Sequence, residues 1–200
     1  MTVVRATPAT WHPDDIDHAV RLLAATPTHE GRDPDLLRQW ALTATEFGAS
    51  LPATPCHARI VQLQGGLDEG LLARYTSRPA PTLTLFTDSV QLAERVIAEN
   101  GWRDWYPPGS VRAAALAHEA VHAQLHHGPH RARLKRALGH VVLRFGRRRV
   151  YGHVAGTEEI AAHAYAQVTC GLGRSPLVLT TALSEHLNLP PLTHSDRREN

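Results

Sequence analysis

The sequence predicts an α+β domain of ordinary size, and three observations lead to this prediction. The chain has 200 residues, 42% of them hydrophobic, which is enough to bury one core. Apolar residues recur with helical spacing over residues 36–47 and again within residues 110–128. Residues 82–87 instead alternate polar and apolar side chains, which is typical of a strand with one exposed face.

The composition excludes several classes of protein. The charged fraction of 20% is too low for a disordered chain, and no apolar run approaches the ~20 residues that span a bilayer. Residues 1–15 contain no apolar leader segment. Only Cys56 and Cys170 are present, too few for a disulfide scaffold. We therefore expect a globular cytoplasmic protein that has no membrane partner.

Two helices are expected in residues 1–55, which we treat as an N-terminal helical segment. The first begins at Pro13 and is interrupted at Pro27, because proline is favoured at a helix start and cannot continue a helix. The second covers residues 36–47 and ends at Gly48, since glycine is preferred just after the last turn.

Residues 56–189 are expected to form the main domain, followed by a flexible tail over residues 190–200. Residues rich in Val, Ile, Leu and Thr between Gly or Pro breaks predict its strands, and capping residues before apolar-periodic stretches predict its helices. In chain order, the expected elements are a strand over 58–63, an ambiguous stretch over 67–81, a strand over 82–87, helices over 90–100 and 110–128, strands over 141–145 and 149–154, and helices over 157–170 and 176–187.

The residues that carry chemistry lie on the long predicted helix at 110–128. Residues 118–122 read His-Glu-Ala-Val-His. Because residues four apart lie one above the other on a helix, both His118 and His122 can bind one metal ion. Glu119 projects to the side, where its carboxylate can take a proton from a metal-bound water.

The third ligand has three candidates in this sequence. A catalytic zinc site keeps one open position, so three protein ligands suffice. A third histidine within the helix motif would require His at position 128, which is a glycine. His130 follows shortly after the helix, and Glu158 and Glu159 lie at the start of the helix predicted over 157–170. Each of these three residues is a candidate for the third ligand.

Glu159 belongs to a second recognisable pattern, with Ala162 and Ala166 three and seven positions later. Together with the His-Glu-x-x-His helix, this stretch resembles the small gluzincins, namely the ImmA/IrrE-type metallopeptidases and the peptidase part of ArdC-like antirestriction proteins. The resemblance covers residues 80–175 and is specific in these two short motifs. It implies a zincin-like, minimal gluzincin fold, with a small mixed or antiparallel sheet over the His-Glu-x-x-His helix.

The resemblance also implies a ligand set and an activity. Zn²⁺ would be bound by His118, His122 and Glu159, and a zinc metallopeptidase would use Glu119 as general base. Measured from Glu158, the two small positions would hold an alanine and a tyrosine, so the register favours Glu159 over Glu158. The substrate would be a peptide or a protein.

Further site residues are expected around the metal. An edge strand preceding the zinc helix would pair with an extended substrate, and residues 82–86 alternate as such a strand requires. Its residues are Thr82, Leu83, Thr84, Leu85 and Phe86. A polar side chain must also stabilise the oxyanion. The candidates are Tyr106, Tyr151 and His153, while His163, four residues after Glu159, could be a hydrogen-bond partner of a ligand or a surface residue.

A basic segment separates the two metal-binding motifs. Between Glu119 and Glu158 there are eight basic residues and no acidic ones, in a run from Arg131 to Arg149. Because the net charge of the chain is +2, the remainder carries −6. The run is either a solvated helix and hairpin or a nucleic-acid contact surface. The second reading gives an alternative function, a zincin-fold regulatory or antirestriction-type protein that binds nucleic acid or a protein partner. A purely structural zinc protein would normally contain more cysteine.

Overall fold

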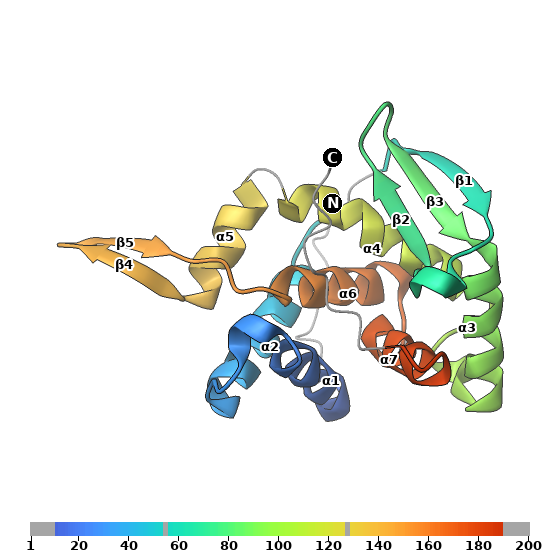
Figure 1. The fold of residues 1–200 in the computed structure, drawn as a ribbon, viewed down its shortest axis with the longest axis horizontal. Coiled ribbons are helices and arrows are strands. Elements are labelled where there is room, and N and C mark those ends of the chain that lie inside the picture. Colours follow the sequence, from blue (N-terminus) through green and yellow to red (C-terminus); the bar gives the residue numbers. More distant parts are fainter. Residues whose placement is uncertain (1–10, 54–55, 127–128, 190–200) are drawn as a thin grey trace, which may run out of the picture.

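The computed structural model describes residues 11–53, 56–126 and 129–189, which form an α+β fold (Figure 1). The tail expected over residues 190–200 lies outside the described residues. In the part of the chain that is described, no helix combines the length and the apolar character needed to cross a membrane.

Two N-terminal helices, α1 (Pro13–Ala24) and α2 (Pro34–Ala49), are joined through a 3₁₀ turn, η1 (Pro27–His29). Each helix begins with proline, whose missing N–H costs nothing in the first turn. The Asp33 carboxylate caps α2 by accepting a hydrogen bond from the backbone N–H of Asp35 at 2.9 Å. Both helices predicted in this segment are confirmed.

A three-stranded sheet follows, in the order β1 (Arg59–Leu63), β3 (Thr82–Phe86), β2 (Ala73–Thr76). Strand β3 runs parallel to β1 and antiparallel to β2. The strand predicted at residues 82–87 is therefore correct, but Thr82–Phe86 is the central strand, and its expected position at the sheet edge is wrong. Alternation reports only which face is buried, here the face of Leu83 and Leu85, whereas edge position depends on pairing with strands elsewhere in the chain.

The ambiguous stretch over residues 67–81 contains η2 (Leu67–Glu69) and the edge strand β2. Four residues, Ala-Arg-Tyr-Thr, are too few to display a period of two, so the sequence held no signal for this strand.

The sheet leads directly into α3 (Thr87–Glu99), which is followed by η3 (Trp102–Asp104) and α4 (Ser110–His126). The Asp88 carboxylate accepts hydrogen bonds from the backbone N–H groups of residues 65–67 at 2.8, 3.3 and 3.4 Å. These bonds tie the loop after β1 to the start of α3.

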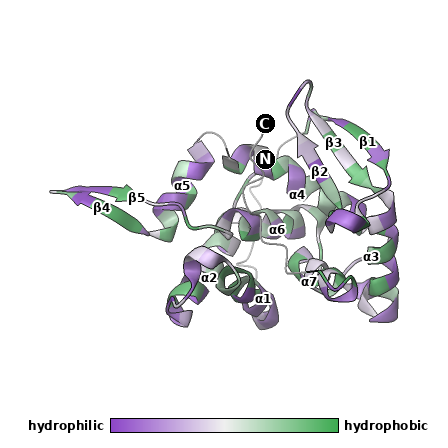
Figure 2. Ribbon diagram, viewed as in Figure 1, coloured by the Kyte–Doolittle hydropathy of each residue, from purple (hydrophilic) through white to green (hydrophobic). Residues whose placement is uncertain are grey.

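The basic segment forms α5 (Pro129–Leu138) and a hairpin of β4 (Val141–Phe145) and β5 (Arg148–Tyr151). The three-stranded sheet lies at one end of the molecule, and the hairpin projects from the other end (Figure 1). Both hydrophobic and hydrophilic residues occur along it, as the colouring of the ribbon shows (Figure 2). The chain then returns to the body as α6 (Thr157–Cys170) and α7 (Pro176–His186).

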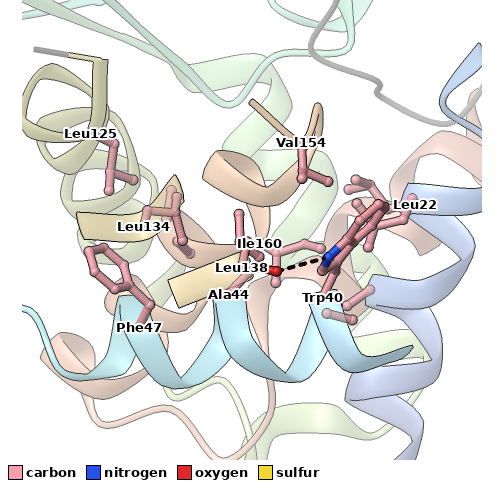
Figure 3. Packing of buried hydrophobic residues seen from close by; sticks show 14 of the residues in the cluster. Leu22, Trp40, Ala44, Phe47, Leu125, Leu134, Leu138, Val154 and Ile160 are labelled. Atoms are coloured by element: carbon pink, nitrogen blue, oxygen red, sulfur yellow. Dashed lines mark hydrogen bonds between the residues drawn. The ribbon is translucent and has the colours of Figure 1, made fainter. Parts of the chain in front are cut away.

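One hydrophobic cluster joins the N-terminal helices to α4, α5 and α6 (Figure 3). Trp40, 2% exposed, lies at its α2 side, and its indole N–H donates to the Leu138 carbonyl at 3.2 Å. Leu23, Leu125 and Ile160 pack into the same cluster. Helices α1 and α2 therefore share a core with the helices that carry the candidate metal ligands.

The contact between α2 and α6 is a direct approach of two backbones. A Cβ atom added to Gly48 would lie 2.0 Å from the carbonyl oxygen of Ala161. Only glycine at this position lets α2 lie this close to α6.

Candidate metal centre

Helix α4 supplies the first pair of ligating groups. His118 and His122 lie one turn apart on it, and their ring centroids are 4.6 Å from each other. Val121 and Leu125, on another face of α4, are completely buried. The apolar residues fix the rotation of the helix, so that both imidazoles point toward α6.

Helix α6 supplies the second pair. Glu159 and His163 are also one turn apart, and the Nε2 atom of His163 lies 3.3 Å from Oε1 of Glu159. Ala162 and Ala166 are fully buried on this helix, and α4 and α6 are in extensive contact. These small side chains at positions three and seven after Glu159 occupy the buried side of α6, as the sequence predicts.

The four side chains converge on one point. The Nε2 atoms of His118 and His122 are 3.0 Å apart, and each lies beside a different oxygen of the Glu159 carboxylate, at 3.0 and 3.2 Å. The rings of His118 and His163 have centroids 4.4 Å apart. Ligand atoms of His118, Glu159 and His163 all lie within 4.8 Å of one another.

These distances fit a shared metal ion. Bonds of about 2.0–2.2 Å to a tetrahedral ion place its ligand atoms roughly 3.3–3.6 Å apart. The separations of 3.0–3.3 Å in the structure lie at or just below that range. Imidazole nitrogens with a carboxylate suit zinc and other first-row divalent ions alike. The residues therefore fit a metal site of three ligands, with His163 available as a fourth donor or as a partner of Glu159.

The protonation states in this cluster follow from burial and charge. Burial alone would raise the pKa of Glu159, but the neighbouring imidazoles, His118 foremost, hold it well below its usual value. Burial would likewise lower the pKa of His118, and the Glu159 carboxylate raises it instead. Burial, aided by the charge of His118, lowers the pKa of His163 to about 4. Glu159 is thus an anion and His163 a neutral imidazole near neutral pH, as ligation requires.

Glu119 occupies a different side of the site from the ligands. Its Oε2 accepts a hydrogen bond from the backbone N–H of Tyr75 in β2 at 2.9 Å. Tyr75 is therefore a site residue that the sequence analysis missed, and no sequence signal marked it. The strand that lies beside Glu119 is β2, an edge strand, and not the expected Thr82–Phe86.

The two alternative third ligands lie elsewhere. The Glu158 carboxylate is 3.6 Å from Nδ1 of His153 and 3.8 Å from Nε of Arg131, and so faces away from His118 and His122. His130 is on α5, and among the described residues the carboxylate that contacts both His118 and His122 is that of Glu159. The structure brings Glu159, and neither of the other two, to the histidine pair.

The expected oxyanion donors are not assembled at the metal centre. Tyr106 is 1% exposed, and its hydroxyl donates to the Ser175 carbonyl at 2.7 Å. Because this hydroxyl is buried and already hydrogen-bonded, the expectation that Tyr106 stabilises the oxyanion is wrong. Tyr151 ends β5, paired with Val141 in the hairpin. His153 contacts Glu158 and lines a separate pocket. His163, in contrast, lies directly against Glu159.

Comparisons with known proteins add no assignment. No family model matches the chain, and no significant match was found among curated proteins or among solved structures.

Proposed function

We propose that this protein is a zinc-dependent metallopeptidase with a zincin-like fold of the gluzincin kind. The single observation that carries the proposal is the contact of the Glu159 carboxylate with both His118 and His122. Glu119, next to His118 in sequence, faces strand β2. The resemblance of the two short motifs to ImmA/IrrE-type peptidases and the α+β architecture support it. The position of the sheet next to α4 is also what such a fold requires.

The chain's own residues have distinct roles in this proposal. Zinc, when held by these side chains, lowers the pKa of a bound water toward ~7 and polarises a substrate carbonyl. Glu119 accepts the proton of the attacking water and passes it to the leaving nitrogen as the amide bond breaks. The Tyr75 N–H orients the Glu119 carboxylate, and His163 positions Glu159 through the 3.3 Å contact.

The outer edge of β2 is the proposed place for the substrate backbone. Tyr75 directs its N–H to Glu119 rather than to β3, so this edge of the sheet faces the catalytic carboxylate. An extended peptide added to β2 would continue the sheet and carry its scissile bond past Glu119. This role replaces the one expected for Thr82–Phe86.

The test compares Glu119 with Glu158, a glutamate whose carboxylate lies beside His153 and Arg131 instead of the histidine pair. Glu119→Gln keeps the size of the side chain but cannot accept a proton, so it should retain one zinc per chain and lose hydrolysis by about 10²–10⁴-fold. Glu158→Gln is the matched control and should retain both zinc and activity. Zinc is measured by elemental analysis, and cleavage by mass spectrometry of a peptide library. Equal cleavage by wild type and Glu119→Gln would refute the mechanism.

The basic hairpin favours a second candidate function, binding of nucleic acid. Phe145 is 65% exposed, and the side chains of Arg144 and Arg149, opposite each other in the ladder, are also exposed. Exposed arginines beside an aromatic ring suit phosphates and unstacked bases. Neutralising residues 147–149 should leave zinc content unchanged and flatten the salt dependence of oligonucleotide binding. Absence of binding by wild type at low salt would remove this candidate.

A further inference from the structure

A pocket separate from the metal centre lies between the N-terminal helices and the base of the basic hairpin. It has a volume of about 120 Å³, and its walls come from Thr28, His29, Arg32, Trp40, His140 and residues 153–155. Since roughly 10–15 Å³ of such space already accommodates one water molecule, the pocket has room for a ligand of several non-hydrogen atoms. None of its lining residues belongs to the metal centre.

Aromatic rings give the pocket a fixed frame. The Trp40 indole is held by its hydrogen bond to the Leu138 carbonyl, and its ring lies 5.6 Å from that of His29 and 5.5 Å from that of His140. His29 is 4% exposed, and its Nδ1–H donates to the Leu23 carbonyl at 3.0 Å. This bond fixes the imidazole and leaves Nε2 as the nitrogen available to a ligand.

Apart from Thr28, the polar side chains that line the pocket are a guanidinium and imidazoles. The Arg32 guanidinium lies 5.4 Å from the centre of the Trp40 ring. His29, His140 and His153 add three imidazoles, and no acidic residue lines the pocket. Among these groups, and within the described residues, only His153 contacts a carboxylate, that of Glu158 at 3.6 Å.

The cationic groups also act on one another. Burial lowers the pKa of His29, and the charges of Arg32, His140 and His153 lower it further. The imidazoles are not arranged around a cation, because the metal-ligating cluster found in the described part of the chain is that of the metal centre. A guanidinium and nitrogen donors in one pocket, with no acidic residue in its lining, are the arrangement expected for an anion.

We propose that this pocket binds a phosphate group, with the Arg32 guanidinium and the His140 imidazole as its donors. A tetrahedral phosphate accepts several hydrogen bonds from different directions, and the guanidinium fork matches two of its oxygens. The phosphate is either a free ion or part of a nucleotide. The site is independent of the metal centre, so it stands whether or not the proposed peptidase function does.

The test is calorimetric titration of the full chain with inorganic phosphate in a low-salt chloride buffer, with acetate as the comparison anion. Arg32→Gln, at an exposed position whose loss should not affect folding, should weaken phosphate binding by at least about tenfold, the scale of one charge-assisted hydrogen bond. Arg136→Gln removes an exposed charge of the same kind from α5, outside the pocket lining, and should change binding by less than about twofold. Failure of wild type to bind phosphate, equal binding of acetate, or an unchanged Arg32→Gln would each overturn the proposal.

Two further arms locate the phosphate and identify its source. A His118→Ala variant whose circular dichroism matches wild type should bind phosphate unchanged, and loss of binding there would assign the anion to the metal centre instead. Adenosine monophosphate binding more tightly than inorganic phosphate, with adenosine not binding, supports a nucleotide as the source. Equal binding of the two phosphate compounds supports the free ion. Binding of adenosine at the affinity of the monophosphate would show that the phosphate is not recognised.

Discussion

Replacing Gly48 with alanine tests whether the N-terminal helices position the metal centre. The added Cβ would lie 2.0 Å from the carbonyl oxygen of Ala161, 2.6 Å from its carbonyl carbon and 2.7 Å from its Cα. Ordinary carbon–oxygen contacts are no closer than about 3.3 Å, so α2 and α6 would have to separate by roughly 1.3 Å. Ala161 is two residues from Glu159, so the same displacement reaches the site.

The expected magnitude follows from opposing effects. Overpacking costs ~1–3 kcal/mol, and here all three close atoms belong to rigid backbone, which places the cost at the upper end. The better helix propensity of alanine offsets about 1 kcal/mol of it. Gly48→Ala should therefore lower the free energy of unfolding by ~2 kcal/mol. Metal sites tolerate ligand shifts of only about 0.5 Å, so zinc affinity should also fall by at least roughly tenfold.

The measurements are urea unfolding of the metal-free protein and competition with a zinc chelator. Gln39→Ala, at an exposed position of the same helix, is the control and should change stability by no more than about 0.5 kcal/mol. Ala161→Gly, combined with Gly48→Ala, should not restore stability, because the clash is with backbone atoms that glycine retains. A Gly48→Ala protein as stable as wild type, or rescue by Ala161→Gly, would refute the reasoning.

Three further predictions concern single side chains. Glu159→Gln should weaken zinc binding, measured by chelator competition, by much more than Glu158→Gln, because only Glu159 contacts the histidine pair; equal effects would contradict the ligand assignment. His163→Ala should reduce zinc affinity by about 10–100-fold, the effect of losing a partner of a ligand, and a loss as large as that of Glu159→Gln would make His163 a ligand itself. Asp15→Ala should lower the free energy of unfolding by about 3 kcal/mol, because the buried guanidinium of Arg174, now 2.6 Å from Asp15 Oδ1, would keep only the exposed Asp14 carboxylate at 3.7 Å as a counter-charge; a loss below about 1 kcal/mol in urea unfolding would contradict this.

The parts of the site that could be predicted from sequence are those governed by helix periodicity. His118 and His122 share a face because they are four residues apart, and the alanines after Glu159 mark the buried side of α6. The rest depended on contacts between distant segments. No local pattern indicated that the Tyr75 N–H would meet Glu119, or that Thr82–Phe86 would be flanked by strands on both sides. The candidate oxyanion donors were chosen by side-chain type alone. Side-chain type does not show that the Tyr106 hydroxyl is buried and already hydrogen-bonded to the Ser175 carbonyl.

The N-terminal helices, which no motif connects to metal chemistry, are part of the scaffold of the site. Glu159 reaches the histidine pair only if α6 lies close to α4, and α6 is held on its other flank by α2, at the contact between Gly48 and Ala161. A ligand on one helix and its partners on another require a fixed separation between helices, and packing of small residues sets that separation more rigidly than flexible side chains can. Helices α1 and α2 therefore cannot be treated as an appendage to the candidate metal site. Changes in the buried face of α2 should alter zinc affinity even though no residue of α2 belongs to the ligand cluster.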